Sequence, residues 1–247
     1  ILEGFSAQER FLSNVSHEIK TPIAVMLTEA QTIDAKGAPP HVREFAESMV
    51  EEMVRLGRLV ESFLTLTRVR DGKGIARISS YAVNDLIIDS MEHCAAMARQ
   101  HRVRLAPMLL DEDDTVDATI AGERELLSTM LDNLVRNAIR FSPLESRVEV
   151  GASVDGDVVT LRVRDYGPGI PPDRLETIFD RFAQAPEEQR KGRGHGLGLA
   201  IAQGIAELHG GVVRAENCED EGCTFSVSLP LYHPEQGARA DRDGVAT

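Results

Sequence analysis

The sequence predicts an α + α/β fold, in which a helical hairpin is followed by an α/β sandwich. Through residue 70 the apolar side chains recur in steps of three and four, which indicates amphipathic helices. After residue 75, stretches that alternate apolar and polar residues come between helical ones, as in a mixed sheet covered by helices. The 247 residues are enough for two modest domains. We expect domains at 1–72 and 73–232, followed by a disordered tail at 233–247.

The overall charge and composition argue against several classes of protein. A net charge of −13 disfavours nucleic-acid binding, because the phosphate backbone would be repelled. No apolar run approaches the roughly 20 residues of a membrane span. The three cysteines form no CxxC pair, so we expect reduced thiols. The chain begins at Ile1 within a helical pattern, which favours a cytoplasmic piece of a longer protein, with any membrane anchor upstream.

The first predicted helix, residues 1–35, carries a histidine on its polar side. Its apolar stripe includes Leu12, Val15, Ile19, Ile23 and Met26. His17 lies on the opposite side, with Glu18 beside it and Thr21 one turn further along. An exposed surface histidine without a function would give the same local pattern.

A second predicted helix, residues 41–70, completes a hairpin. Gly and paired Pro in Lys36–Pro40 separate it from the first helix. Two helices with one narrow apolar stripe each bury those stripes poorly, whereas two copies of the hairpin can form a four-helix bundle. We therefore predict a homodimer through the hairpin, with Asp71–Ile75 as the linker to the second domain.

The second domain is predicted to contain a mixed sheet with helices on one face. The predicted helices cover 83–100, 123–141 and 196–209, with a short helix from about residue 172, and the predicted strands cover 77–81, 102–109, 116–121, 146–154, 158–164, 212–217 and 223–231. The inward residues are expected to be Leu86, Ile87, Met91 and Ala95 in the first helix, and Leu127, Met130, Leu134 and Ile139 in the second. The basic, glycine-rich residues 185–195 indicate a lid.

Three motifs in this domain suit the binding of a nucleotide. Asn133 and Asn137 share one helix face, where neutral amides can hold hydrated Mg²⁺ and phosphate oxygens. Asp165 is followed by alternating glycines and offers an acceptor for an adenine amino group in a tight turn. The glycines of Gly192–Gly198 lead into a helix, whose N-terminal N–H groups favour phosphate. Each motif alone is equally compatible with an ordinary polar helix face or glycine turn.

The ordered set of motifs resembles the cytoplasmic core of two-component sensor histidine kinases. FLSNVSHEIKTPI resembles the phospho-acceptor H box of that family, and NLVRNAIRFSP resembles its N box. DYGPGIP, IFDRFAQ and GHGLGLAI resemble the first glycine box, the F box and the second glycine box, in the order of the family. The resemblance covers about residues 5–231. It implies a dimerisation and histidine-phosphotransfer domain, followed by a Bergerat-type ATP-binding domain.

The resemblance also implies roles for individual residues. His17 would accept the phosphoryl group, Glu18 would act as base, and Thr21 would assist dephosphorylation of the partner. Asn137 would bind Mg²⁺. The nucleotide would be lined by Asn133, Arg140, Phe141, Asp165, Gly167, Gly169, Gly194, Gly196, Leu197 and Gly198. Phe141 stands where the family commonly has Tyr, so it can stack on a base without donating a hydroxyl hydrogen bond.

The function implied is ATP-dependent autophosphorylation of His17, followed by transfer to an aspartate in the receiver domain of a response regulator. The same residues are compatible with a phosphatase acting on that regulator. Two alternatives stay open at this point: a nucleotide-binding scaffold or phosphatase that lacks kinase activity, and an ATPase machine built on the same fold. The histidine helix disfavours the second alternative.

Overall fold

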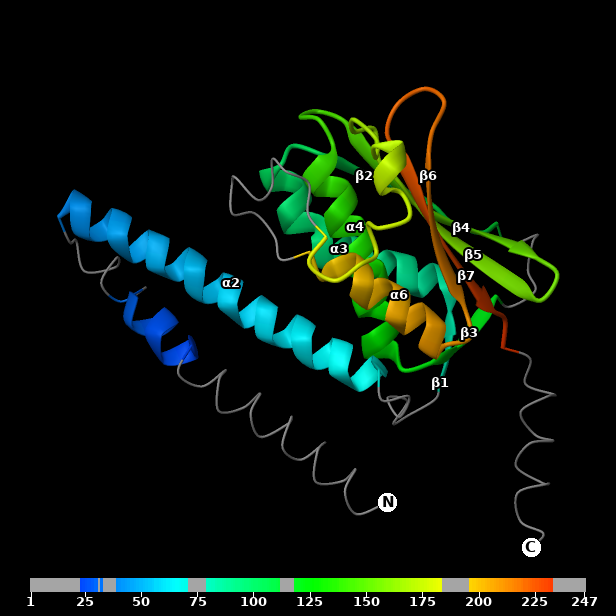
Figure 1. The fold of residues 1–247 in the computed structure, drawn as a ribbon, viewed down its shortest axis with the longest axis horizontal. Helices are drawn as coiled ribbons and strands as arrows, with labels where there is room; N and C mark the ends of the chain where they lie inside the picture. The colour runs from blue at the N-terminus through cyan, green and yellow to red at the C-terminus, as the bar shows by residue number, and fades with distance from the viewer. Residues whose placement is uncertain are drawn as a thin grey trace, which may run out of the picture. The chain divides into compact units, whose positions relative to one another are not determined.

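The computed structural model describes residues 23–30, 32, 39–70, 79–111, 118–183 and 196–232 (Figure 1). The chain divides into two compact units, Ile1–Arg68 and Val69–Thr247. The predicted linker, the predicted lid and the predicted tail lie outside the described residues. Within the described residues, no helix is both long and apolar enough to cross a membrane.

The first unit is helical where it is described. Residues 23–30 form a helix, and α2 spans Pro40–Arg70, as the sequence predicts. Ala46 and Met53 are buried along α2, whereas Phe45 on the predicted apolar stripe is 67% exposed. In a single chain, one large apolar side chain of this stripe is therefore exposed to solvent. The predicted dimer would cover such a side chain, and it stays a prediction.

The second unit consists of a five-stranded sheet with helices on one face (Figure 1). The strands are β2 (Arg104–Met108), β4 (Arg147–Asp155), β5 (Val158–Arg164), β7 (Cys223–Pro230) and β6 (Val212–Asn217), in that spatial order. β2 runs parallel to β4, and the other pairs are antiparallel. β1 (Ser79–Ala82) and β3 (Thr119–Gly122) form a separate two-stranded sheet. The mixed sheet predicted from the sequence is confirmed.

The helical layer is formed by α3 (Val83–Gln100), α4 (Arg124–Phe141) and α6 (Gly198–Leu208). α4 packs against both α3 and α6, and its side chains Leu127, Met130 and Leu134 are completely buried. On the sheet, alternate residues of β5 and β7 face the same core, namely Val159, Leu161, Val163, Phe225, Val227 and Leu229. The apolar residues that recur every three or four positions in α4 and every second position in β5 and β7 therefore pack into one apolar core.

Two sequence predictions about these elements are wrong in detail. Met91 and Ala95 are only half-buried, because Ser90 and Cys94 occupy the buried side of α3 instead. α6 begins at Gly198 rather than at residue 196, because Gly196 has a φ of 64°, outside the right-handed helical region. The short helix predicted from about residue 172 is confirmed, as a single 3₁₀ turn, η2 (Pro172–Arg174).

Truncating Leu134 to alanine is expected to destabilise the second unit by about 2–5 kcal/mol, because a completely buried leucine would leave a cavity between α4 and the sheet. Leu144→Ala is the matched control. That side chain is 68% exposed, so its loss should change stability by less than about 0.5 kcal/mol. Urea unfolding followed by circular dichroism measures both values, and equal effects would contradict this assignment of the core.

Candidate nucleotide site

The polar side of α4 carries the amides predicted to meet a nucleotide. Asn133 and Asn137 are both half-buried. The amide nitrogen of Asn133 donates to the Thr129 carbonyl at 3.0 Å, which fixes its orientation. In the part of the chain that the structure describes, no hydrogen bond or ion pair engages the amide of Asn137.

Glycines bring the predicted site segments into close contact with α4. A Cβ on Gly167 would lie 2.6 Å from the carbonyl oxygen of Phe141, so the loop after β5 passes directly over the end of α4. A Cβ on Gly198 would lie 3.1 Å from Oδ1 of Asn133, where α6 begins. The predicted site residues on α4, the loop after β5 and the start of α6 are thus neighbours. At these two positions a side chain would crowd α4, so glycine allows the two segments to lie close to that helix.

The F box and the second glycine box meet at a third glycine. The N–H of Phe182 donates to the Gly196 carbonyl at 2.8 Å, and a Cβ on Gly196 would lie 2.5 Å from the Ala183 carbonyl oxygen. Phe182 itself is 63% exposed, with a φ of 64°. Leu197, buried at 3%, precedes the first turn of α6. The described residues on either side of the predicted lid are therefore joined through backbone contacts.

Asp165 is the buried acid of the site, with 2% of its surface exposed. It follows β5, and its Oδ1 accepts the N–H of Gly167 at 2.9 Å and that of Cys223 at 3.3 Å. Its Oδ2 accepts a hydrogen bond from the Cys223 thiol at 3.0 Å. Burial, and next the nearby Asp165 carboxylate, raise the pKa of the Cys223 thiol. The Asp165 carboxylate thus accepts hydrogen bonds from three donors, and a carboxylate can accept a further one from an amino group.

The β6–β7 hairpin fastens the loop that contains Asp165, and the sequence interpretation missed its role. The Asn217 side chain accepts from the Ile170 N–H at 2.8 Å and donates to the Ile170 carbonyl at 2.7 Å. A Cβ on Gly222 would lie 2.0 Å from the Asp165 carbonyl oxygen. The loop glycine Gly169 has a φ of 73° beside Asn217. Only the pairing of β5 with β7 reveals these contacts.

Arg140 and Phe141 lie at the end of α4, next to this loop. The Arg140 guanidinium carbon is 5.4 Å from the centre of the Phe141 ring, and both side chains are half-buried. This cation–π contact orients the ring that the resemblance assigns to the nucleotide. The predicted site residues His17, Glu18, Thr21 and Gly194 lie outside the described residues.

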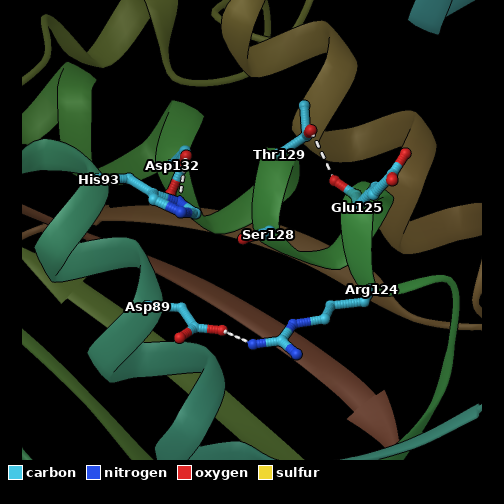
Figure 2. A pocket seen from close by; sticks show the side chains of 7 residues that line it. All are labelled: Asp89, His93, Arg124, Glu125, Ser128, Thr129 and Asp132. Carbon is cyan, nitrogen blue, oxygen red and sulfur yellow. Dashed lines mark hydrogen bonds and ion pairs between the residues drawn. The ribbon is translucent and has the colours of Figure 1, made fainter.

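A pocket of about 370 Å³ lies elsewhere, between α3 and α4 (Figure 2). Its lining is Asp89, His93, Arg124, Glu125, Ser128, Thr129 and Asp132. Arg124 donates to Asp89, and His93 Nδ1 lies 3.2 Å from Oδ2 of Asp132. The pocket contains none of the residues predicted to bind the nucleotide, and four of its side chains already form the two pairs just named. We therefore place the candidate nucleotide site at Asp165 and Asn133 instead.

Family models match both units of the chain. Residues 7–72 match the model described as "His Kinase A (phospho-acceptor) domain". Residues 122–233 match "Histidine kinase-, DNA gyrase B-, and HSP90-like ATPase".

Individual relatives extend the likeness over nearly the whole chain. The sensor-like histidine kinase SenX3 of Mycobacterium tuberculosis is 30% identical over 96% of the chain, and AfsQ2 of Streptomyces coelicolor is 32% identical over 96%. The chain spans only 58% and 44% of their lengths. Among solved structures, full-length ShkA in complex with AMPPNP superimposes with a TM-score of 0.70 at 26% identity, covering 90% of this chain and 46% of that one.

Proposed function

This chain belongs to the two-component sensor histidine kinases, and we propose that it moves the γ-phosphoryl group of ATP to His17 and then to an aspartate of a response regulator. One observation carries the proposal: a phospho-acceptor domain and an ATPase-type domain occur together in one chain. His17 falls within the first matched segment, and the cluster around Asp165 falls within the second. Because the donor is ATP, we expect these domains to act in the cytoplasm.

The site around Asp165 supports ATP as the nucleotide. A buried carboxylate prefers a base that offers an amino group, and adenine does. The amide of Asn137 fits Mg²⁺, since it supplies a neutral oxygen that no described group occupies, and Mg²⁺ takes few protein ligands beside phosphates. When bound there, Mg²⁺ would offset negative charge on the transferred group. Asn133, oriented by Thr129, would direct its amide toward the same phosphates.

Three residues of the first domain take part in the proposed transfer and in its reversal. A neutral imidazole, the main form of an ordinary histidine at pH 7, attacks the γ-phosphorus in line. The bond from that phosphorus to the β–γ bridging oxygen breaks and ADP leaves. Glu18 accepts or orients the proton on the other ring nitrogen of His17. The phosphoryl group then passes from His17 to the regulator, and Thr21 would assist its later removal from that regulator.

Incubation with γ-labelled ATP and Mg²⁺ tests the proposal, with two variants that separate binding from chemistry. Wild-type protein should acquire label that is acid-labile and base-stable, as a phosphoramidate is. Asn137→Ala should lose both tight Mg-ATP binding and label. Glu18→Ala should keep the affinity for ATP while labelling about 10²–10⁴-fold more slowly.

Two outcomes would contradict the proposal. ATP binding without any label in the wild-type protein would favour a scaffold or a phosphatase. Steady release of inorganic phosphate without label on the protein would favour an ATPase.

A further inference from the structure

The two oxygens of the Asp165 carboxylate accept different numbers of hydrogen bonds. Oδ1 accepts two backbone N–H groups, from Gly167 at 2.9 Å and from Cys223 at 3.3 Å. Oδ2 accepts one hydrogen bond in the described structure, from the Cys223 thiol at 3.0 Å. A carboxylate oxygen has about two acceptor positions. Oδ1 is therefore saturated by protein, whereas Oδ2 keeps one position for a ligand.

Cys223 is held in place to serve Oδ2. The residue begins β7, is 4% exposed, and pairs through its own carbonyl with the Asp165 N–H at 3.0 Å. The backbone and side chain of Cys223 thus form three hydrogen bonds with Asp165. Burial and the adjacent carboxylate raise the pKa of the thiol, so it stays protonated at neutral pH. Next to a carboxylate, a protonated thiol acts as a donor.

We propose that Cys223 is a positioning residue, whose thiol holds the Asp165 carboxylate so that Oδ2 accepts the amino group of an adenine base. The inference rests on the proposed function, because it takes adenine as the base. The proposal predicts that the Cys223 thiol strengthens the binding of a base that carries the amino group and does not strengthen the binding of a base without one. A thiol that merely filled space in the core would affect all purines alike.

Two diphosphates that differ only in the amino group provide the test: ADP and purine riboside 5′-diphosphate. Neither carries a γ-phosphoryl group, so binding is measured without transfer to His17. With Mg²⁺, calorimetry on the full chain should give wild-type affinity for ADP roughly tenfold or more above that for the analogue. Cys223→Ala should raise the Kd for ADP roughly tenfold and change that for the analogue by less than about twofold.

Three further variants keep the result interpretable. Cys223→Ser keeps a donor and should hold the Kd for ADP within about threefold of wild type. Cys223→Val fills the space without a donor and should reproduce the alanine result if Cys223→Ala does not fold. Cys94→Ala is the matched control, because it removes the same thiol from a completely buried position in α3. It should leave the ratio of the two Kd values unchanged.

The outcomes separate this inference from the proposed function. Wild-type protein that fails to distinguish ADP from the analogue would overturn adenine selection by Asp165, and the role of Cys223 with it. If wild-type protein distinguishes them and Cys223→Val does so equally well, the role of Cys223 is wrong while the proposed function stands. Equal weakening of both ligands by Cys223→Val would likewise make Cys223 a packing residue only.

Discussion

His17→Ala is expected to reduce labelling by γ-labelled ATP to background, because no other group in the proposed mechanism forms the phosphoramidate bond. The affinity for ATP should stay within about twofold of wild type, since the nucleotide is bound by the other domain. Labelling on filters and calorimetric titration measure the two quantities separately. The expected effect is the loss of an entire reaction rather than a reduced rate.

A histidine elsewhere in the helical unit controls for the general loss of an imidazole. His41 lies exposed in the first turns of α2, and His41→Ala should label at the wild-type rate. Substantial label remaining on His17→Ala would contradict His17 as the acceptor. Digestion and mapping of that label would then identify the residue that carries it.

Gly222→Ala is expected to weaken ATP binding on the order of a hundredfold, because it displaces Asp165, the residue proposed to bind the adenine amino group. The added Cβ would lie 2.0 Å from the Asp165 carbonyl oxygen and 2.8 Å from the Tyr166 Cα. The φ of 82° adds strain for any residue with a side chain. We expect a stability loss of roughly 2–4 kcal/mol from strain and overpacking together. Calorimetry and urea unfolding measure the two effects.

Gly156→Ala separates strain from displacement. Gly156 has a φ of 57° in the β4–β5 turn, and a Cβ there would meet no atom within 4 Å. It should cost roughly 1–2 kcal/mol of stability and leave the Kd for ATP unchanged. Near-wild-type ATP affinity in folded Gly222→Ala would show that the hairpin does not position Asp165.

Local pattern was sufficient for most of the second unit. The spacing of Leu127, Met130 and Leu134 predicts the buried side of α4, and alternation in Val159, Leu161 and Val163 predicts β5. In both cases one element buries one regular stripe. α3 departs from this rule because Ser90 and Cys94 occupy its buried side. Small, weakly polar residues pack well between helices, so apolarity alone does not locate that side.

Contacts between distant segments could not be predicted in the same way. The sequence predicts Asp165 as a site residue, and its burial suits that role, whereas the sequence indicates only a reduced thiol at Cys223. The two are brought together by the register of β5 and β7, in which Arg164 pairs with Thr224. The alternation of residues within each strand does not predict which residues of the two strands will pair. The partner of Asp165 is therefore visible only once the sheet is assembled.

The order of strands also governs when during synthesis the domain can form. Among the described strands β7 comes last in sequence, yet it lies between β5 and β6 in the sheet. Until Cys223–Pro230 has left the ribosome, both of those strands lack their neighbour and Asp165 lacks the Cys223 thiol. Pairing segments so far apart closes a long loop late. A nascent chain of this kind therefore acquires the proposed nucleotide site only once β7 has been made, and a product that stops before Cys223 lacks it.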